Sequence, residues 1–150
     1  MKKIYYLLFL SSLTAVAQTQ IGSDINGEAA NDYSGRSVSL SSDGNIIAVG
    51  AAQNNGNGTD DAGHVRVFQN VAGVWTQIGS DINGEADIDL SGVCVSLSSN
   101  GSIVAIGANA NDGNGNLSGQ VRVYQNISGV WTQIGADIDG ESSYDQSGES

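Results

Sequence analysis

Side chains that could bind a cation recur in three short segments of the sequence. Acidic and amide residues alternate in them: Asp24, Asn26 and Glu28; Asp81, Asn83, Glu85, Asp87 and Asp89; and Asp137, Asp139 and Glu141. Loop sites for calcium begin with alternating oxygen ligands of this kind. Alternate residues of an extended segment also share one face, so a solvated strand edge produces the same pattern. Both interpretations stay open, and we predict neither a metal ligand nor a cofactor from the alternation alone.

A glycine-rich stretch, Gly56–Asp60, has the order GNGTD. It resembles the G-x-G-x-D units of calcium-binding β-rolls, but its copy at Gly113–Leu117 ends in leucine instead of aspartate. No helix is predicted after it, so it also lacks the helix N-terminus that a phosphate loop needs. We expect no calcium or phosphate site here.

The sequence contains one histidine and one cysteine, which limits nucleophilic and zinc chemistry. His64 is replaced by Gln120 in the second copy of a long repeat, and Cys94 stands where the first copy has Ser37. Without a second histidine or a paired cysteine we expect no zinc site, no histidine-based triad and no intrachain disulfide. We predict that His64 lies at a strand edge and that Cys94 is a small strand residue.

Two tryptophans share one repeat position, Trp75 and Trp131. Packing between sheets is the favoured role for them, and a platform for a sugar ring is the alternative. Although acids are abundant, nothing singles out a pair spaced for glycoside cleavage. We therefore predict no catalytic residue and a protein that is not an enzyme.

The elements that must position these residues are set by an internal repeat. Ser37–Asn70 returns as Cys94–Asn126, and Thr19, Thr76 and Thr132 begin three copies of TQIG that lie 57 and 56 residues apart. A unit of this length cannot cover both faces of its own sheet, so units must stack on one another.

Each full unit has four runs typical of strands. In the first unit they are Ser37–Ser41, Ile46–Val49, His64–Gln69 and Val74–Ile78, and in the second Val95–Leu97, Ile103–Ile106, Gln120–Gln125 and Val130–Ile134. Asp43-Gly44 and Asn100-Gly101 predict type I′ hairpin turns. The fold class is therefore all-β, with repeated four-stranded antiparallel meanders that form a partial β-propeller of about two blades plus the start of a third. Thr19–Ile21 is expected to be a strand that completes the last blade of the ring.

Residues 1–17 have the pattern of a cleaved signal peptide: Lys2 and Lys3, an apolar run, and Ala15-Val16-Ala17 before Gln18. The apolar run is too short to span a membrane, and no later stretch could do so as a helix. Residues 18–150 hold the repeats, in units of about 19–75, 76–131 and a partial 132–150. The last residues align with the start of a unit, and we expect the chain to be a fragment of a longer propeller.

The charge of the chain excludes one class of partner. The chain has five basic and 16 acidic residues, and outside the signal segment only Arg36, Arg66 and Arg122 are basic. Nucleic-acid binding needs clustered cations, so we expect no nucleic-acid partner.

The repeats resemble the FG-GAP repeats of integrin-α-like β-propellers in their bacterial secreted form. Ser34-Gly35 and Ser91-Gly92 match the FG position, and Gly50-Ala51-Ala52 and Gly107-Ala108-Asn109 match the GAP position, with phenylalanine and proline replaced. The resemblance implies a secreted or cell-surface scaffold for adhesion or ligand binding, whose partner is an extracellular protein or carbohydrate. The family's calcium loop between the first two strands does not carry over, because Ser41–Asn45 and Ser98–Ser102 are too short to wrap the ion. The alternative function is a fragment of a propeller-fold polysaccharide hydrolase or lyase whose active site lies in blades that this chain lacks.

Overall fold

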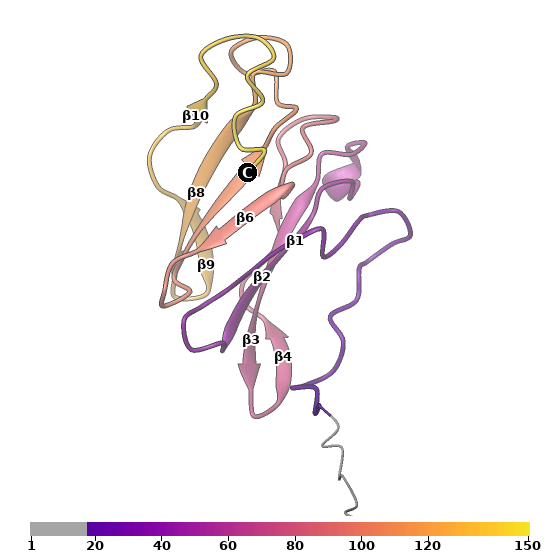
Figure 1. Cartoon of the computed structure of the whole chain (residues 1–150), viewed down its shortest axis with the longest axis vertical. Helices are drawn as coiled ribbons and strands as arrows, with labels where there is room; N and C mark the ends of the chain where they lie inside the picture. The colour runs from indigo at the N-terminus through magenta and orange to yellow at the C-terminus, as the bar shows by residue number, and fades with distance from the viewer. Residues whose placement is uncertain (1–17) are drawn as a thin grey trace, which may run out of the picture.

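The computed structural model describes residues 18–150, and the predicted signal peptide lies outside the described residues. Two antiparallel sheets make up this part of the chain (Figure 1). The first contains β1 (Ser37–Leu40), β2 (Ile46–Ala51), β3 (His64–Val71), β4 (Val74–Gln77) and the short β5 (Ile82–Asn83). The second contains β6 (Cys94–Leu97), β7 (Ile103–Ala108), β8 (Gln120–Ile127), β9 (Val130–Gln133) and the short β10 (Ile138–Asp139).

In both sheets, the four longer strands follow one another as a meander, and the short fifth strand pairs with the third. A single 3-10 turn, Gly56–Gly58, is the one helical element of the described residues. The prediction of an all-β chain built from four-stranded antiparallel meanders is confirmed. The two sheets do not close into a ring. The short strands β5 and β10 were not predicted, and they lie within the polar connections.

The prediction of a strand at Thr19–Ile21 is wrong, because this segment is irregular. Its copies extend hairpins: Thr76 lies opposite Gln69, and Thr132 lies opposite Gln125. Among the described residues the N-terminal copy has no such strand to pair with. It is held instead by the indole of Trp75, whose Nε1 donates to the carbonyl oxygen of Ile21 at 3.1 Å.

The turn between β1 and β2 is a hairpin, as predicted, but it is not type I′. Gly44 has a φ of 70°, whereas Asp43 is not among the residues with positive φ. The Asp43 carboxylate accepts hydrogen bonds from Ser41 Oγ at 2.6 Å and from Asn45 N at 3.0 Å, which stabilises a longer loop. These bonds, with Ser41 first, lower the pKa of Asp43 from 3.8 to about 2. Left-handed residues at both central positions occur instead at Ala72-Gly73, between β3 and β4.

The core lies between the two sheets, where β6 packs against β1 and β2. Its buried members are Ala48, Val65, Val67 and Ile82 from the first sheet and Val95, Val104, Ile106 and Tyr124 from the second. Equivalent positions of the two units have very different surroundings. Val95 is 7% exposed because the first sheet covers it, whereas its counterpart Val38 is 57% exposed. Each unit therefore has one covered face and one open face.

Close backbone approach fixes how one unit sits on the next. A Cβ atom at Gly50 would collide with the carbonyl oxygen of Gly92, and one at Gly107 would collide with that of Gly148. Ser37 Oγ donates to the Gly92 carbonyl oxygen at 2.7 Å, and Ser39 Oγ accepts from Leu97 N at 2.9 Å. The third copy thus begins to stack on the second unit as the second stacks on the first.

The difference between covered and open faces predicts unequal effects of two equivalent substitutions. Val95→Ala should lower the free energy of unfolding by about 2 kcal/mol, because it removes two buried methyl groups and leaves a cavity. Val38→Ala, the matched control, should change it by less than about 0.5 kcal/mol. Urea unfolding at low protein concentration measures both values. Equal losses would contradict the assignment of the open face.

The lowered pKa of Asp43 predicts a pH-dependent contribution to stability. The carboxylate stabilises the fold above its unfolded pKa of 3.8, and this contribution is lost as the pH falls through about 2. Asp43→Asn installs the residue that the second unit has at Asn100, where the amide oxygen accepts from Ser98 and Ser102. The difference in unfolding midpoint between wild type and variant should therefore shrink on acidification. An Asp43 carboxyl that titrates by NMR near its ordinary pKa would refute this.

Candidate functional site

The alternating acids of the three connections fall into separate structural roles. The first acid of each segment accepts a hydrogen bond from the glutamine four residues earlier: Asp24 from Gln20 at 2.8 Å, Asp81 from Gln77 at 2.7 Å, and Asp137 from Gln133 at 2.7 Å. A later acid closes a turn by accepting a backbone N–H: Asp32 from Ala29, Asp89 from Ala86, and Asp145 from Ser142. These side chains thus fix the path of each connection. For the alternating residues, the interpretation as a calcium site and the interpretation as a solvated strand edge both stay open.

Two buried arginines tie the connections to the sheets. Arg66 in β3 donates to the carbonyl oxygen of Asn26 at 2.7 Å, and its guanidinium lies 3.6 Å from Glu28. Arg122 repeats both contacts, with the Asn83 carbonyl oxygen at 2.9 Å and Glu85 at 3.2 Å. The glutamates are half exposed, so the ion pairs contribute little by themselves. The arginines chiefly satisfy backbone groups and orient the two glutamates.

His64 opens β3 and lies near two of the acids. Glu28, His64 and Asp81 each offer a ligand atom, and the three atoms lie within 4.8 Å of one another. Among the described residues no other three His, Cys, Asp or Glu side chains come together in this way. Burial is the main cause that lowers the pKa of His64, and nearby Asp81 and Glu28 oppose it. This grouping was not predicted from the sequence, because only a second histidine or a paired cysteine was considered as a zinc partner for His64.

The turns at the middle of the connections have a left-handed backbone conformation that is unusual for two of the three residues that adopt it. Asn31, Ile88 and Tyr144 occupy the same repeat position, with φ of 71°, 65° and 70°. Left-handed backbone is rare for a β-branched residue and costs about 1–2 kcal/mol. Hydrogen bonds hold it in place: Ile88 N donates to the Asp60 carbonyl oxygen, and Tyr144 N donates to that of Asn116.

The side chains at this repeat position, which we call the tip position, point into solvent. Ile88 is 61% exposed and Tyr144 is 68% exposed. A fixed, strained turn thus presents a different side chain in each copy. The sequence offered one signal for it, because this is one of three positions of the connections that differ in all three copies, but the backbone strain could not be read from the residues.

The two tryptophans do not have the same surroundings. Trp131 donates its indole N–H to the Ile78 carbonyl oxygen at 2.8 Å, as Trp75 does to Ile21. Trp131 also lines an open cavity of about 300 Å³ together with Tyr124, Asp81 and Asn83. It packs against the core between the sheets, which agrees with the favoured packing role.

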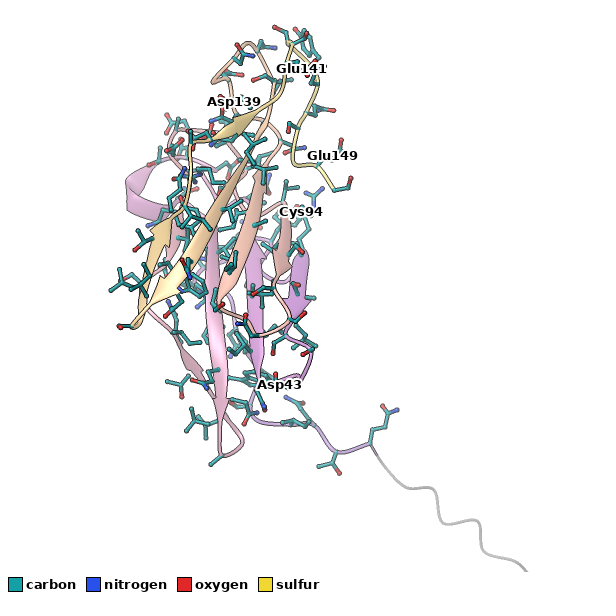
Figure 2. The ribbon with its side chains drawn as sticks, turned by 90° about the vertical axis from the view of Figure 1, so that its left-hand side faces the viewer. Asp43, Cys94, Asp139, Glu141 and Glu149 are labelled. Carbon is teal, nitrogen blue, oxygen red and sulfur yellow. The ribbon has the colours of Figure 1, made fainter. Side chains whose placement is uncertain are left out.

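Cys94 lies apart from the labelled acids of the last connection (Figure 2). Cys94 is partly buried in β6, and Figure 2 shows it below Asp139 and Glu141, which lie at the upper end of the molecule. Asp43 lies at the opposite end, so the β1–β2 turn and the connections face different surroundings (Figure 2). No described helix is long and apolar enough to cross a membrane.

No protein-family model matches the sequence, and no curated protein matches it either.

The strain at the tip position predicts that Ile88→Asn stabilises the protein. Asparagine tolerates left-handed backbone, and the exposed isoleucine loses little buried surface, so the free energy of unfolding should rise by about 1 kcal/mol. Asn31→Ile is the reciprocal control and should lower it by a similar amount. Chemical denaturation measures both. A loss of stability in Ile88→Asn would show that the isoleucine side chain supports the fold.

Proposed function

We propose that this chain is a secreted, non-enzymatic β-propeller repeat protein that serves as a scaffold for adhesion or ligand binding. The observation that carries the proposal is the tip position, where Asn31, Ile88 and Tyr144 stand on the same left-handed turn in three copies. Strain that persists at an exposed, variable position has no role in packing. It is typical of binding residues displayed by a rigid framework.

Two open faces support the propeller architecture. The uncovered face of the first sheet presents Val38, which is 57% exposed, and the partly exposed Ile47, which correspond to the covered Val95 and Val104. The uncovered face of the second sheet presents a complementary set, Cys94, Ser96, Ala105, Gly107 and Val121. The two faces are the two halves of the interface that already joins the units. Head-to-tail stacking of further units on both faces would bury them, as blades of a propeller do.

The placement of the connections favours one end of the scaffold as the binding end. In Figure 1 the connections that contain η1, β10 and the C-terminal residues lie together at the upper end, and the β3–β4 hairpin lies at the lower end. The tip position lies within or beside these connections, because Tyr144 follows β10 and Ile88 N donates to the Asp60 carbonyl oxygen near η1. An extracellular protein or carbohydrate is the partner that suits an exposed aliphatic and aromatic pair with acids around it.

The proposal is tested by binding to purified extracellular polysaccharides and adhesion proteins immobilised on a biosensor. The chain should bind at least one of them, and the double variant Ile88→Asn/Tyr144→Asn should bind about tenfold more weakly or worse, a loss of about 1.4 kcal/mol. Ile127→Asn is the matched control, because Ile127 is 53% exposed and ends β8 near the β8–β9 hairpin, away from the tip position. Its binding should equal that of the wild type.

The same polysaccharides distinguish a scaffold from an enzyme. Incubation with the chain should release neither reducing ends nor unsaturated products. Release of either would overturn the non-enzymatic proposal in favour of a hydrolase or lyase. Absence of binding to every member of the panel, or binding that the double variant leaves unchanged, would overturn the assignment of the tip position.

A further inference from the structure

The imidazole of His64 is buried without satisfying its nitrogens. The side chain is 1% exposed, and Nε2 has no hydrogen-bond partner among the described residues. Nδ1 faces Glu28, but the nearest carboxylate oxygen, Oε2, is 3.9 Å away, which is too far for a hydrogen bond. Leaving a polar group buried and unpaired costs about 1–3 kcal/mol, so this arrangement calls for an explanation.

Three segments meet at this imidazole. Glu28 comes from the first connection, His64 begins β3, and Asp81 directly precedes β5, whose Asn83 pairs with His64. Their ligand atoms lie within 4.8 Å of one another. Ligands around a tetrahedral zinc ion lie about 3.3 Å apart, as follows from bonds of about 2.0–2.1 Å. The present separations of the ligand atoms exceed those around zinc by roughly 1 Å. The half-exposed Glu28 side chain can move by this distance.

We propose that Glu28, His64 and Asp81 form a site for zinc or a zinc-like divalent transition metal. One imidazole nitrogen and two carboxylates make a three-ligand set, and water completes the tetrahedron. Imidazole as a ligand suits zinc, copper and nickel, whereas calcium prefers six to eight oxygens. The two carboxylates outnumber the single guanidinium of Arg66 nearby, so the site attracts a dication.

The surrounding hydrogen bonds orient both carboxylates for this purpose. Arg66 lies beside Oε1 of Glu28 at 3.6 Å, whereas Oε2 faces the histidine. Gln77 Nε2 donates to Oδ1 of Asp81 at 2.7 Å, which leaves Oδ2 for an ion. Such outer partners hold metal ligands in place and typically matter about 10- to 100-fold for affinity.

The second unit shows how the same position looks without a metal ligand. Gln120 replaces His64, and its Nε2 donates to Glu85 Oε2 at 3.2 Å. The Gln120 amide therefore makes a hydrogen bond to its glutamate, whereas His64 Nδ1 lies 3.9 Å from Glu28 Oε2 and makes none. The chain thus contains its own control for the site, with equivalent backbone, arginine and glutamate.

The test is a titration of the untagged chain with Zn²⁺ against a chromophoric chelator. The wild type should bind one equivalent. Because His64 is the only histidine, its imidazole ¹⁵N signals need no assignment and should shift on zinc binding. His64→Gln installs the residue of the second unit and should weaken zinc binding by about tenfold or more while keeping the unfolding midpoint. Asp137→Asn, the acid equivalent to Asp81, and Cys94→Ser, the residue of the first unit, should bind zinc like the wild type.

Several results would overturn the site. Unchanged affinity in His64→Gln, imidazole signals that do not move, or loss of binding in Cys94→Ser would each place zinc elsewhere. Displacement of zinc by an equal concentration of Ca²⁺ would show an oxygen-only site. None of these results bears on the tip position, so the zinc site and the proposed scaffold function fail independently.

Discussion

Each sheet of this chain has two faces rich in apolar side chains, and one sheet can bury only the face that meets a neighbour. The burial of Val95 against the first sheet, beside the exposure of Val38 at the equivalent position, shows this directly. The core therefore lies between units instead of within one. Backbone contact at Gly50 and Gly92 sets the distance between the sheets, and any larger residue there would separate them. Stability in such an array is a property of neighbouring pairs of units.

This packing leaves the long connections to be held by polar groups. Buried Arg66 and Arg122 bind carbonyl oxygens of the connections, and aspartates close the turns within them. Because these residues recur at the same positions in both units, they belong to the architecture. A residue that departs from the repeat, such as His64 beside its copy Gln120, has no architectural reason to differ.

The sequence predicted the repeat, the eight longer strands and the all-β class, because alternation and repeat phase are local signals. Prediction from the sequence failed for features that depend on contacts formed in the folded chain. Thr19–Ile21 has the sequence of a strand but finds no strand to pair with within residues 18–150, and the Asp43 side chain bonds its own loop instead of allowing a type I′ turn. The approach of Glu28 and Asp81 to His64 joins three segments and depends on β5 pairing with β3. The spacing of these three residues along the sequence does not predict that their side chains come together.

Repeat proteins separate what must recur from what is free to change. In this chain the recurring residues pack the sheets and satisfy the backbone, so substitutions among them would disturb every interface of which they form part. Positions that change between copies while their backbone stays the same are therefore where selection for binding can act at little cost in folding. Ile88 and Tyr144 differ on an identical left-handed turn, and His64 and Gln120 differ on an identical strand start. The first pair faces solvent, and the second faces a carboxylate, so the two departures provide different chemistry from a single framework.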